Sequence, residues 1–397
     1  MLENNNRIMG GKIWSFILSF SEDYKQCPVC VMDTTDPEIH IDDDGCTYCK
    51  KYKKTIHLLP KFQKNHKNIL KQLIDKIKST GGKNDYDCLI GVSGGVDSSY
   101  VAYYVKEILG LRPLALHLDN GWNDELAVHN IEKILRKLNI DLWTEVLDWD
   151  EFRSLQLSFL KASVPDCEIP TDHAITASLY NTARKFNIKY ILVGNNLVTE
   201  SIMPNTWSRG HSDWKYISSI SSVHGKIPLK TFPHYTFFQG WWRNNHSSIK
   251  KERILSYIYF DKKEATFLLQ SKFGWEPYTG KHHESVYTKF YQAYWLPEKF
   301  GYDKRKGHLS ALICAGQVTR KEALEELKYP SVTVGEISNL KEYVANKFEI
   351  SIKDLDELFN KPNKNFYDYP SHYHCWQYFL LRGIYRLTLK PISRVFR

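Results

Sequence analysis

The stretch of residues 86–100, YDCLIGVSGGVDSSY, constrains the fold of this chain more than any other. An apolar run typical of a buried strand passes through Gly94 and Gly95 into a segment of helical character. Where a strand enters a helix through glycines, free backbone N–H groups and the positive end of the helix dipole converge, which suits a phosphate. The GxxxxGK[ST] loop is excluded, since no Lys follows the glycines and the spacing is too short. The turn therefore predicts an anion-binding site; a tight turn with incidental serines is the alternative.

The sequence SGGVDSS resembles the pyrophosphate loop of the ATP pyrophosphatases, also called PP-loop enzymes. Those enzymes adenylate a carbonyl or amide oxygen and release pyrophosphate. The resemblance implies an ATP site with Asp97 in a catalytic role. The residues expected to bind ATP in this turn are Ser93, Gly94, Gly95, Val96, Asp97, Ser98 and Ser99.

The composition is that of an ordinary soluble globular protein, with 397 residues of which 42% are hydrophobic and 25% charged. No stretch approaches the apolar length of a membrane span. The apolar run 13–20 is too short for a signal peptide and no small-residue cleavage site follows it, so we expect an ordinary strand or helix there. A cytoplasmic protein is expected.

The net charge of +9 fits nucleic acid, an anionic membrane surface or negatively charged small substrates, and charge alone does not choose among them. The Lys-rich stretch 50–83 is expected to be a solvated helix face. From Leu380, the last eighteen residues carry five basic residues and no acid, interleaved with aromatic and leucine side chains. We expect a packed C-terminal helix; the alternative is a basic amphipathic tail that touches a membrane or a partner.

Four cysteines form two CxxC pairs separated by fifteen residues, Cys27 with Cys30 and Cys46 with Cys49. Four thiolates at this spacing suit one tetrahedral zinc ion, and a site filled entirely by protein ligands is expected to be structural. An iron–sulfur centre and a pair of disulfides are the competing interpretations. Between the pairs, residues 32–45 predict a β-ribbon that turns at Asp44-Gly45.

After the glycine turn, strand and helix patterns alternate, which predicts an α/β fold with a parallel sheet and helices on both faces. A helix over 59–79 is expected to link the cysteine-rich unit to this domain. The further strands are expected at 113–118, 142–147, 190–193 and 254–260, and the further helices at 124–138, 150–162 and 172–186, the last opened by Thr171.

Ligands of such sheets bind beyond the carboxyl ends of the strands, which groups the glycine turn, Asp119 and the segment from Gly194 into one crevice. Asp119 is expected to contact the ribose or adenine of ATP, with a turn cap as the alternative. Gly194 and Asn195, followed by Glu200, resemble the strand-end GxN…E element of ammonia-using PP-loop enzymes. That resemblance implies Glu200 as a magnesium ligand, although the spacing is one residue longer than the commonest form.

Two irregular stretches lie beside this crevice. Residues 162–173 are polar and interrupted by prolines, so we expect a loop that meets the acceptor substrate or the adenylate. Cys167 within it is a candidate sulfur carrier, but no second cysteine lies nearby in the sequence. The aromatic-rich stretch 203–245 is expected to pack as the core of an insertion, with stacking on a base or sugar as the alternative.

The C-terminal part is expected to be mostly helical. Lys304 and Arg305 are candidate catalytic residues that would neutralise pyrophosphate and the adenylate as they form; a solvated charge run is the alternative. The block KHHE at 281–284 favours the catalytic interpretation. Thr319 and Glu322 predict a capping box, which places the charges before it in a loop.

Together these motifs resemble the N-acetyl sugar amidotransferases of bacterial surface polysaccharide (lipopolysaccharide O-antigen) and flagellin glycan synthesis. The segments that carry the resemblance are the CxxC…GCxxC start, GVSGGVDSSY, LHLDNGW, SVPDCEIPTDHAI, ILVGNN and the run from FGWEPYTGKHHE to CAGQVTRKEAL. The resemblance covers nearly the whole chain and implies an adenine nucleotide alpha-hydrolase-like fold of the PP-loop type. The expected units are 1–58 with the zinc ribbon, 59–260 with the ATP domain and its insertion at about 203–245, and the helical part 261–397 with its basic tail.

The resemblance implies that ATP and Mg²⁺ bind at the glycine turn and that the N-acetyl carbonyl of a nucleotide-linked sugar is adenylated. Ammonia then replaces AMP, and the acetamido group becomes an acetamidino group. The chain has no recognisable glutaminase nucleophile, so a separate glutaminase subunit resembling those of the histidine pathway is expected as partner, and no nucleic acid. The alternative is a tRNA-thiolating PP-loop enzyme, which generally needs a catalytic cysteine cluster in its core.

Overall fold

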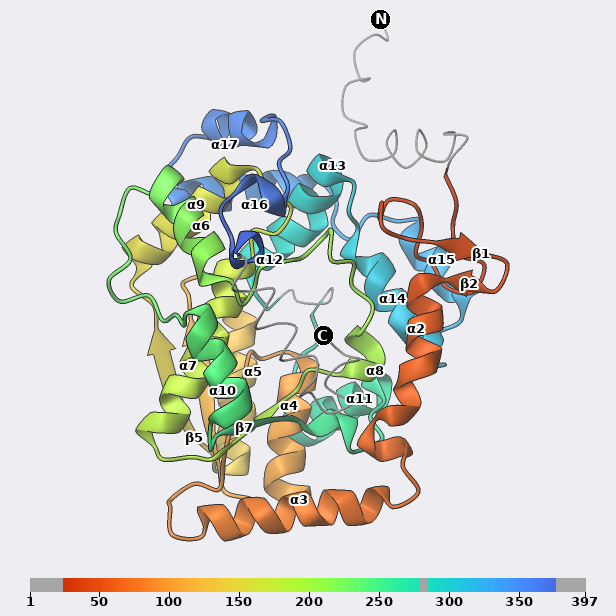
Figure 1. The fold of residues 1–397 in the computed structure, drawn as a ribbon, viewed down its shortest axis with the longest axis vertical. Helices are drawn as coiled ribbons and strands as arrows, with labels where there is room; N and C mark the ends of the chain where they lie inside the picture. Colours follow the sequence, from red (N-terminus) through yellow and green to blue (C-terminus); the bar gives the residue numbers. More distant parts are fainter. Residues whose placement is uncertain (1–23, 279–283, 376–397) are drawn as a thin grey trace, which may run out of the picture.

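The computed structural model describes residues 24–278 and 284–375 (Figure 1). Its centre is a five-stranded sheet in the order β5-β4-β3-β6-β7, in which every neighbouring pair is parallel. The predicted α/β class is therefore confirmed. The strands are β3 (Cys88–Gly91), β4 (Pro113–Asp119), β5 (Asp141–Val146), β6 (Tyr190–Val193) and β7 (Lys250–Arg253).

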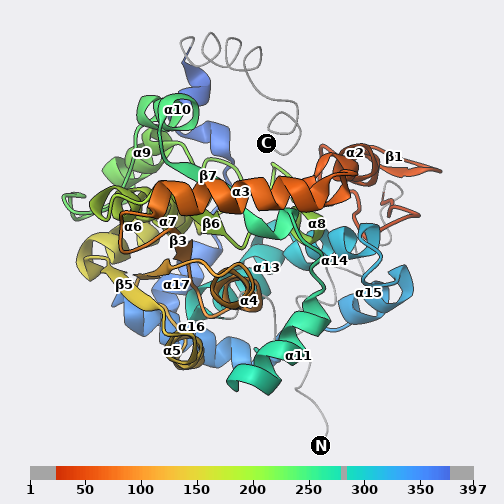
Figure 2. The ribbon, with the colours of Figure 1, turned by 90° about the horizontal axis from the view of Figure 1, so that it is seen from below.

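Helices cover both faces of this sheet because its central strands are apolar on both sides. Cys88 and Ile90 pack against one set of helices, whereas Leu89 packs against α7 (Ile169–Lys185) on the other face. Figure 2, which views the molecule from below, shows α3 crossing the middle of the view. The helices of the first face are α3 (His66–Gly81), α4 (Val96–Tyr103, continued by a π-helix at Tyr104–Ile108), α5 (Glu125–Leu138) and α11 (Lys262–Phe273).

The prediction of a last strand at 254–260 is wrong. The strand is the polar segment Lys250–Arg253, and a 3₁₀ turn, Ile254–Ser256, follows it. Ile254 and Leu255 are fully buried in the core beneath α4 and α11. These residues are apolar because the turn that contains them is buried. The strand β7 lies at the edge of the sheet, where charged side chains are tolerated.

Two helices begin at other positions than expected. α7 begins at Ile169, with Pro170 in its first turn, so Thr171 lies inside the helix and does not open it. α14 (Lys304–Cys314) begins directly after its N-cap Asp303, so Lys304 and Arg305 lie in a helix and the predicted loop is wrong. The capping box of Thr319 and Glu322 on α15 (Arg320–Leu327) is confirmed.

A second core lies above the sheet in Figure 1 and joins the aromatic insertion to the C-terminal helices. Tyr216 and Phe232 of the insertion are buried in this core, and Trp207 is buried in the core around the four cysteines, as core packing predicts. Phe238 and Trp242 are exposed, so the prediction holds for only part of the insertion. Of the helices not yet named, those in and around this core are α6 (Trp149–Ala162), α9 (Trp214–His224), α12 (Val286–Phe290), a π-helix (Tyr291–Trp295), α13 (Leu296–Phe300), α16 (Val334–Phe348) and α17 (Ile352–Phe359). Helix α10 (Phe237–His246) lies beside α7 (Figure 1).

The N-terminal unit forms a short ribbon and a helix. β1 (Ile41–Asp42) pairs antiparallel with β2 (Gly45–Cys46), which confirms the predicted ribbon, and Gly45 has a φ of +116°. α2 (Thr47–Thr55) and two 3₁₀ turns (Ile56–Leu58 and Pro60–Phe62) lead to α3, so the linking helix is shorter than predicted.

Three expectations concern residues outside the described ranges: the element at 13–20, Lys281 to His283 of the KHHE block, and the basic tail from Trp376. Within the described ranges, none of the helices combines the length and apolar character that a bilayer span requires.

The carboxylate of Glu151 ties the insertion to α6. Its two oxygens accept hydrogen bonds from the backbone N–H groups of Lys230, Thr231 and Phe232 at 2.9–3.1 Å. Glu151 is buried, so loss of its carboxylate would leave backbone donors without acceptors.

We expect Glu151→Ala to lower the free energy of unfolding by about 2 to 4 kcal/mol and Glu151→Gln by less, since the amide keeps one acceptor oxygen. Urea denaturation followed by circular dichroism measures this. Glu342→Ala, at an exposed position of α16, serves as the control. Equal losses in Glu151→Ala and Glu342→Ala would contradict this role.

Candidate functional site

The glycine turn lies between β3 and α4, where the sequence places it. Gly94 has a φ of +84°, and a Cβ there would lie 2.7 Å from the Ala127 carbonyl oxygen, so only glycine fits. Ser98 Oγ accepts from the Ser93 N–H at 3.2 Å and donates to the Gly95 carbonyl at 3.1 Å. Gly95 is the N-cap of α4 and Asp97 lies in its first turn. The turn thus combines a glycine backbone, two hydroxyls and a helix N-terminus, which suits a phosphate chain.

Two side chains from the segment after α11 donate hydrogen bonds to the carbonyl group of Gly94. It accepts hydrogen bonds from the indole Nε1 of Trp275 at 2.8 Å and from the hydroxyl of Tyr278 at 3.2 Å. Carbonyl and N–H of one trans peptide point in opposite directions, so these donors fix the side toward which the Gly95 N–H points. Sequence analysis missed this role of Trp275 and Tyr278, because no short motif links them to the turn.

The segment that carries these two donors is fixed in turn by Asn130, a fully buried residue of α5. Asn130 Nδ2 donates to the Glu276 carbonyl and Asn130 Oδ1 accepts from the Glu276 N–H, both at 2.9 Å. Glu284 lies at the same turn, since its Oε1 is 3.1 Å from the place that a Cβ of Gly95 would take. The residues that follow the last helix of the sheet domain therefore pack directly on the phosphate turn.

The end of β6 lies beside α4. A Cβ at Gly194 would come within 3.2 to 3.3 Å of the backbone of Asp97 and Ser98, so glycine allows this close approach. Asn195 is exposed. The carboxylate of Glu200 accepts from the N–H of Asn196 at 3.1 Å, across the short helix α8 (Leu197–Glu200). Its role as a magnesium ligand stays a prediction.

Asp119 caps the turn after β4. Its Oδ1 accepts from the Gly121 N–H at 2.9 Å and from Asn123 Nδ2 at 3.0 Å. The turn-cap alternative describes these contacts, and contact of Asp119 with ATP stays a prediction. Asn120 Nδ2 lies 3.4 Å from Thr171 Oγ1, so the end of β4 adjoins the first turn of α7.

Lys304 and Arg305 have different surroundings. Lys304 pairs with Glu168 at 3.1 Å; burial alone would lower the pKa of this amine, but Asp166 and Glu168 raise it above its usual value. Arg305 pairs with its neighbour Asp303 at 2.6 Å and donates to the Tyr329 carbonyl at 2.7 Å. Lys304 therefore faces the loop before α7, whereas Arg305 bonds to the N-cap of its own helix and to the backbone at Tyr329. The catalytic roles of both stay predictions.

An ionic cluster at that loop was missed by the sequence analysis. The His211 ring lies 2.6 Å from Ser208 Oγ and 3.0 Å from Asp172, and Ser208 donates to Asp166. Burial alone would lower the pKa of His211, but the hydrogen bond to Asp172 and the charge of Asp166 raise it to about 9. The imidazolium form of His211 is therefore favoured at neutral pH and is unsuited to act as a general base there.

Cys167 in the same loop is fully buried. Burial raises the pKa of its thiol well above the usual range, which disfavours the thiolate that sulfur transfer needs.

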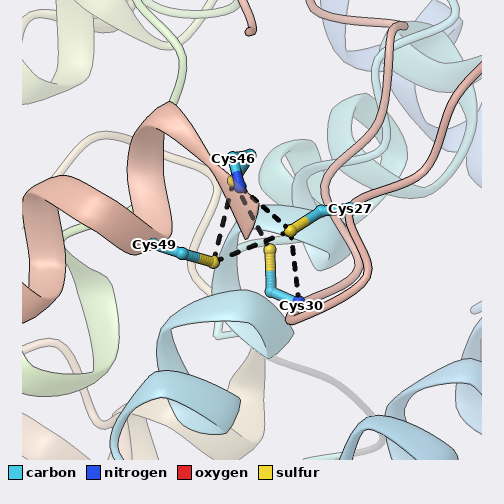
Figure 3. Close-up of side chains that lie close together, drawn as sticks. All are labelled: Cys27, Cys30, Cys46 and Cys49. Atoms are coloured by element: carbon cyan, nitrogen blue, oxygen red, sulfur yellow. Dashed lines mark hydrogen bonds between the residues drawn. The ribbon is translucent and has the colours of Figure 1, made fainter. Parts of the chain in front are cut away.

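Figure 3 shows the four predicted zinc ligands converging from the first loop, the ribbon and α2. The Sγ atoms of Cys30 and Cys46, and those of Cys46 and Cys49, are 3.7 Å apart, and those of Cys27 and Cys49 are 3.9 Å apart. Four sulfurs bound tetrahedrally to zinc at about 2.3 Å lie about 3.8 Å from one another, so the cluster fits that ion. All four cysteines are buried free thiols.

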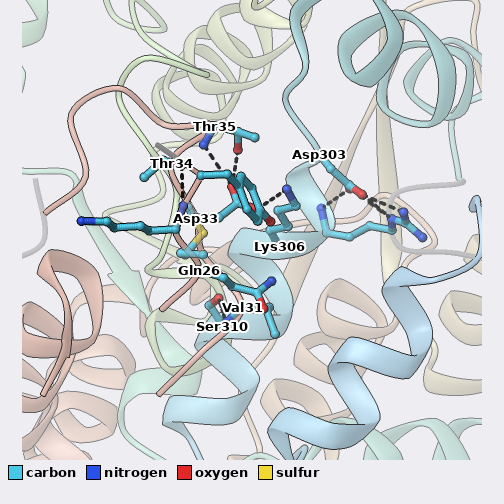
Figure 4. Close-up of polar contacts among 12 residues, drawn as sticks. Gln26, Val31, Asp33, Thr34, Thr35, Asp303, Lys306 and Ser310 are labelled. Carbon is cyan, nitrogen blue, oxygen red and sulfur yellow. Dashed lines mark hydrogen bonds and ion pairs between the residues drawn. The ribbon is translucent and has the colours of Figure 1, made fainter. Parts of the chain in front are cut away.

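The cysteine cluster is docked on α14 (Figure 4). Lys306 pairs with buried Asp33, and Ser310 Oγ accepts from the Val31 N–H at 3.2 Å. Arg320 donates to the carbonyl groups of Cys27 and Cys30 at 3.1 and 2.9 Å. Helix α14 begins with Lys304, so the cysteine-rich ribbon supports the helix that faces the loop before α7.

Two family models match this chain. Residues 65–162 match "NAD synthase", and residues 284–382 match "LPS biosynthesis protein WbpG-like, C-terminal domain". The first match indicates an ATP-utilising enzyme of the PP-loop class. The two matches together support an N-acetyl sugar amidotransferase-like PP-loop family, which confirms the resemblance predicted from the sequence.

Among curated proteins, the uncharacterized protein MJ1599 of Methanocaldococcus jannaschii is 21% identical over 307 residues, which is 77% of this chain and 94% of that protein.

Three solved structures are each 14% identical to the chain: NMN synthetase from Francisella tularensis (TM-score 0.33; 65% of this chain, 95% of that one), NH3-dependent NAD synthetase from Campylobacter jejuni (0.31; 75% and 98%) and the U34-tRNA thiolase NcsA from Methanococcus maripaludis with its [4Fe-4S] cluster (0.32; 75% and 82%). TM-scores of this size are too low to carry a functional argument.

We expect Trp275→Phe, which removes the indole N–H but keeps an aromatic ring, to weaken ATP binding by about 3- to 10-fold, the value of one neutral hydrogen bond. Tyr278→Phe should have a similar or smaller effect. Isothermal titration calorimetry measures both. Trp143→Phe removes an indole donor from β5 that bonds to Glu145 and serves as control. An unchanged ATP affinity in the Trp275→Phe, Tyr278→Phe double variant would refute the positioning role.

The purified protein is expected to carry one zinc ion per chain, and Cys30→Ser should lose it together with thermal stability, since structural zinc contributes directly to folding. Metal analysis and thermal denaturation measure the two effects. Cys375→Ser changes a cysteine outside the cluster and should retain the metal. A visible absorption band with bound iron in the wild type would favour the iron–sulfur interpretation instead.

Proposed function

We propose that this protein is an ATP-dependent, AMP-forming amidotransferase acting on the N-acetyl group of a nucleotide-activated sugar in surface polysaccharide or flagellin glycan synthesis. The observation that carries the proposal is the phosphate turn at the edge of the parallel sheet, contacted by the segment that leads into the WbpG-like domain. In this arrangement, ATP and an acceptor held by the C-terminal helices would meet at one edge of the sheet.

The reaction has two steps. The N-acetyl carbonyl oxygen attacks the α-phosphorus of ATP, the bond from that phosphorus to its bridging oxygen breaks, and pyrophosphate leaves. Ammonia then adds to the activated carbon, the carbon–oxygen bond breaks, a proton is lost and AMP leaves, so that an acetamidino group remains. An amide oxygen is a poor nucleophile, so the protein contributes mainly positioning and charge neutralisation.

In this proposal the backbone of the turn and the hydroxyls of Ser93 and Ser98 bind the phosphates. Asp97 and Glu200 would hold Mg²⁺, which neutralises the leaving pyrophosphate when bound, since carboxylates are the ligands that this ion prefers. Lys304 would act on the acceptor side, next to Glu168. The three units 1–58, 59–260 and 261–397 would provide the zinc ribbon, the ATP site and the acceptor surface.

Ammonia is proposed to come from a separate glutaminase subunit. Three described cysteines outside the CxxC pairs do not favour an internal glutaminase: Cys88 and Cys167 are fully buried, and the Sγ atom of Cys314 lies 3.8 Å from that of Cys49. Cys375 is partly exposed and accepts from Lys215 Nζ at 3.2 Å. The burial of Cys88 and Cys167 weighs against the tRNA-thiolating alternative, which needs reactive cysteines.

Incubation with ATP, Mg²⁺, an ammonium salt and a UDP- or CMP-linked N-acetyl sugar should release AMP and pyrophosphate and replace one oxygen of the sugar by NH, as mass spectrometry would detect. Asp97→Asn should abolish AMP formation while zinc content and the circular dichroism spectrum stay unchanged. Retained AMP formation in that variant would show that the site is misplaced. AMP release with tRNA, but with none of the sugars, would overturn the proposal.

A further inference from the structure

The side chain of Arg243 in α10 is enclosed between two tyrosines. The centre of its guanidinium group lies 4.0 Å from the ring centre of Tyr180 on α7 and 4.0 Å from that of Tyr235. Arg243 is only 9% exposed. Arg243 thus makes cation–π contacts with two rings, and its N–H groups remain available to recognise a ligand.

No carboxylate in the described part of the chain pairs with this buried cation. The Nε atom of Arg243 is fully enclosed and has no hydrogen-bond acceptor there, whereas its two Nη atoms keep some accessible surface. An arginine stays charged in a protein, and a buried charge is costly unless it is paired and hydrogen-bonded. Stacking on two rings offsets part of that cost but satisfies none of the N–H groups in the plane.

Other buried charges of this protein have protein partners. Lys304, with a side chain 10% exposed, pairs with Glu168, and Asp33 pairs with Lys306. Arg153, with a side chain 18% exposed, pairs with both Asp150 and Glu349. Arg243 departs from this pattern, which indicates that its counter-charge is supplied from outside the described chain.

Arg243 is connected to the edge of the sheet by a stack of rings. Tyr235 stacks on His173 at 4.2 Å with an interplanar angle of 10°. His173 lies in the first turns of α7, two residues after Thr171, which adjoins Asn120 at the end of β4. Nine residues of helix separate Thr171 from Tyr180, about 14 Å at 1.5 Å per residue. Arg243 therefore lies beside α7, about 14 Å along this helix from the sheet edge that carries the glycine turn.

His173 does not supply the missing negative charge. Its Nδ1 lies 2.8 Å from the His211 carbonyl oxygen and its Nε2 accepts from the Tyr235 N–H at 3.2 Å, which fixes the neutral tautomer. Burial lowers the pKa of His173 to about 4, so it stays neutral at physiological pH. Among the residues that the structure describes, the printed contacts of Arg243 are with neutral aromatic rings, and no anion is among them.

We propose that the guanidinium edge of Arg243 binds an oxyanion of the acceptor, either a carboxylate on the sugar or a phosphate of its nucleotide carrier. Both ligands match the forked donors of arginine, and rings beside the fork suit the faces of a sugar. This inference rests on the proposed function for the identity of the acceptor, while anion binding itself does not depend on it.

The test is equilibrium binding by calorimetry with the full chain, using inorganic phosphate, UDP-N-acetylglucosamine and UDP-N-acetylglucosaminuronic acid. Arg243→Met should weaken binding of the recognised ligand by about 10- to 100-fold, as expected for charge-assisted hydrogen bonds, and Arg243→Lys should restore part of it. Arg153→Met removes an arginine that has protein partners and should leave the affinities unchanged. Circular dichroism verifies that each variant is folded.

The ligands distinguish the source of the oxyanion. Loss of affinity for phosphate and for both nucleotide sugars assigns Arg243 to the phosphate, and loss confined to the uronic acid assigns it to the sugar carboxylate. Affinities of folded Arg243→Met equal to those of the wild type overturn the inference. A third outcome separates the two proposals. If the wild type forms no AMP with any sugar, and Arg243→Met binds anions more weakly than the wild type does, the proposed function fails and the anion site stands.

Discussion

The parallel pairing of β3 with both β4 and β6 is the constraint on which the rest of the structure depends. In the order β5-β4-β3-β6-β7, the chain leaves β3 toward one side of the sheet and continues at β6 on the other. The connections after β3 and β6 therefore diverge and open a crevice between them. Gly194 lets the end of β6 approach the first turn of α4, so the phosphate turn is set at this crevice by strand order and by one glycine.

The C-terminal part depends on the same turn, because the chain after α11 returns to it. Trp275 and Tyr278 hold the Gly94 carbonyl, and the Asp124 N–H donates to the Glu284 carbonyl at 3.0 Å. Contacts at both ends of one connecting segment fix the region that matches the WbpG-like model on the edge of the sheet that carries the glycine turn. On another side of that region, α14 is fixed by the cysteine-rich ribbon. The proposed acceptor side is therefore held between the two sites that sequence motifs predict.

The sequence predicted those elements for which local pattern and burial agree. The apolar runs of β3, β4 and β6, and the helix that Asp124 caps, lie within a few residues of their predicted positions. In the segment from Ile254, an apolar pattern that resembles a strand belongs to a buried turn. Apolar residues are needed wherever the chain is buried, so such a pattern does not specify a strand. Pro170 is predicted to be part of a loop, but it lies in the first turn of α7. A proline is tolerated there because it loses no helical hydrogen bond.

The candidate site could be predicted only as far as its motifs extend. The phosphate turn and the zinc cysteines are contiguous patterns with a direct chemical meaning. The donors to Gly94 and the partner of Lys304 are not, since Trp275 lies 181 residues from Gly94 and Lys304 lies 136 residues from Glu168. Such contacts form when elements distant in the sequence pack together. Neither element's sequence shows which other element it will contact, and no spacing rule specifies the pair.

The two basic residues that we propose for the acceptor side, Lys304 and Arg243, differ in the charges around them. Lys304 is surrounded by Asp166 and Glu168, so the protein itself stabilises its charge and an incoming anion would have to compete with two carboxylates. Arg243 has rings where Lys304 has carboxylates, so an anion would meet no competing carboxylate among the described residues. Because attraction between charges is strongest where water is excluded, we infer that Arg243 has the larger capacity to select the proposed anionic acceptor. Basic composition alone predicts neither behaviour, since the difference lies in the neighbours that the fold provides.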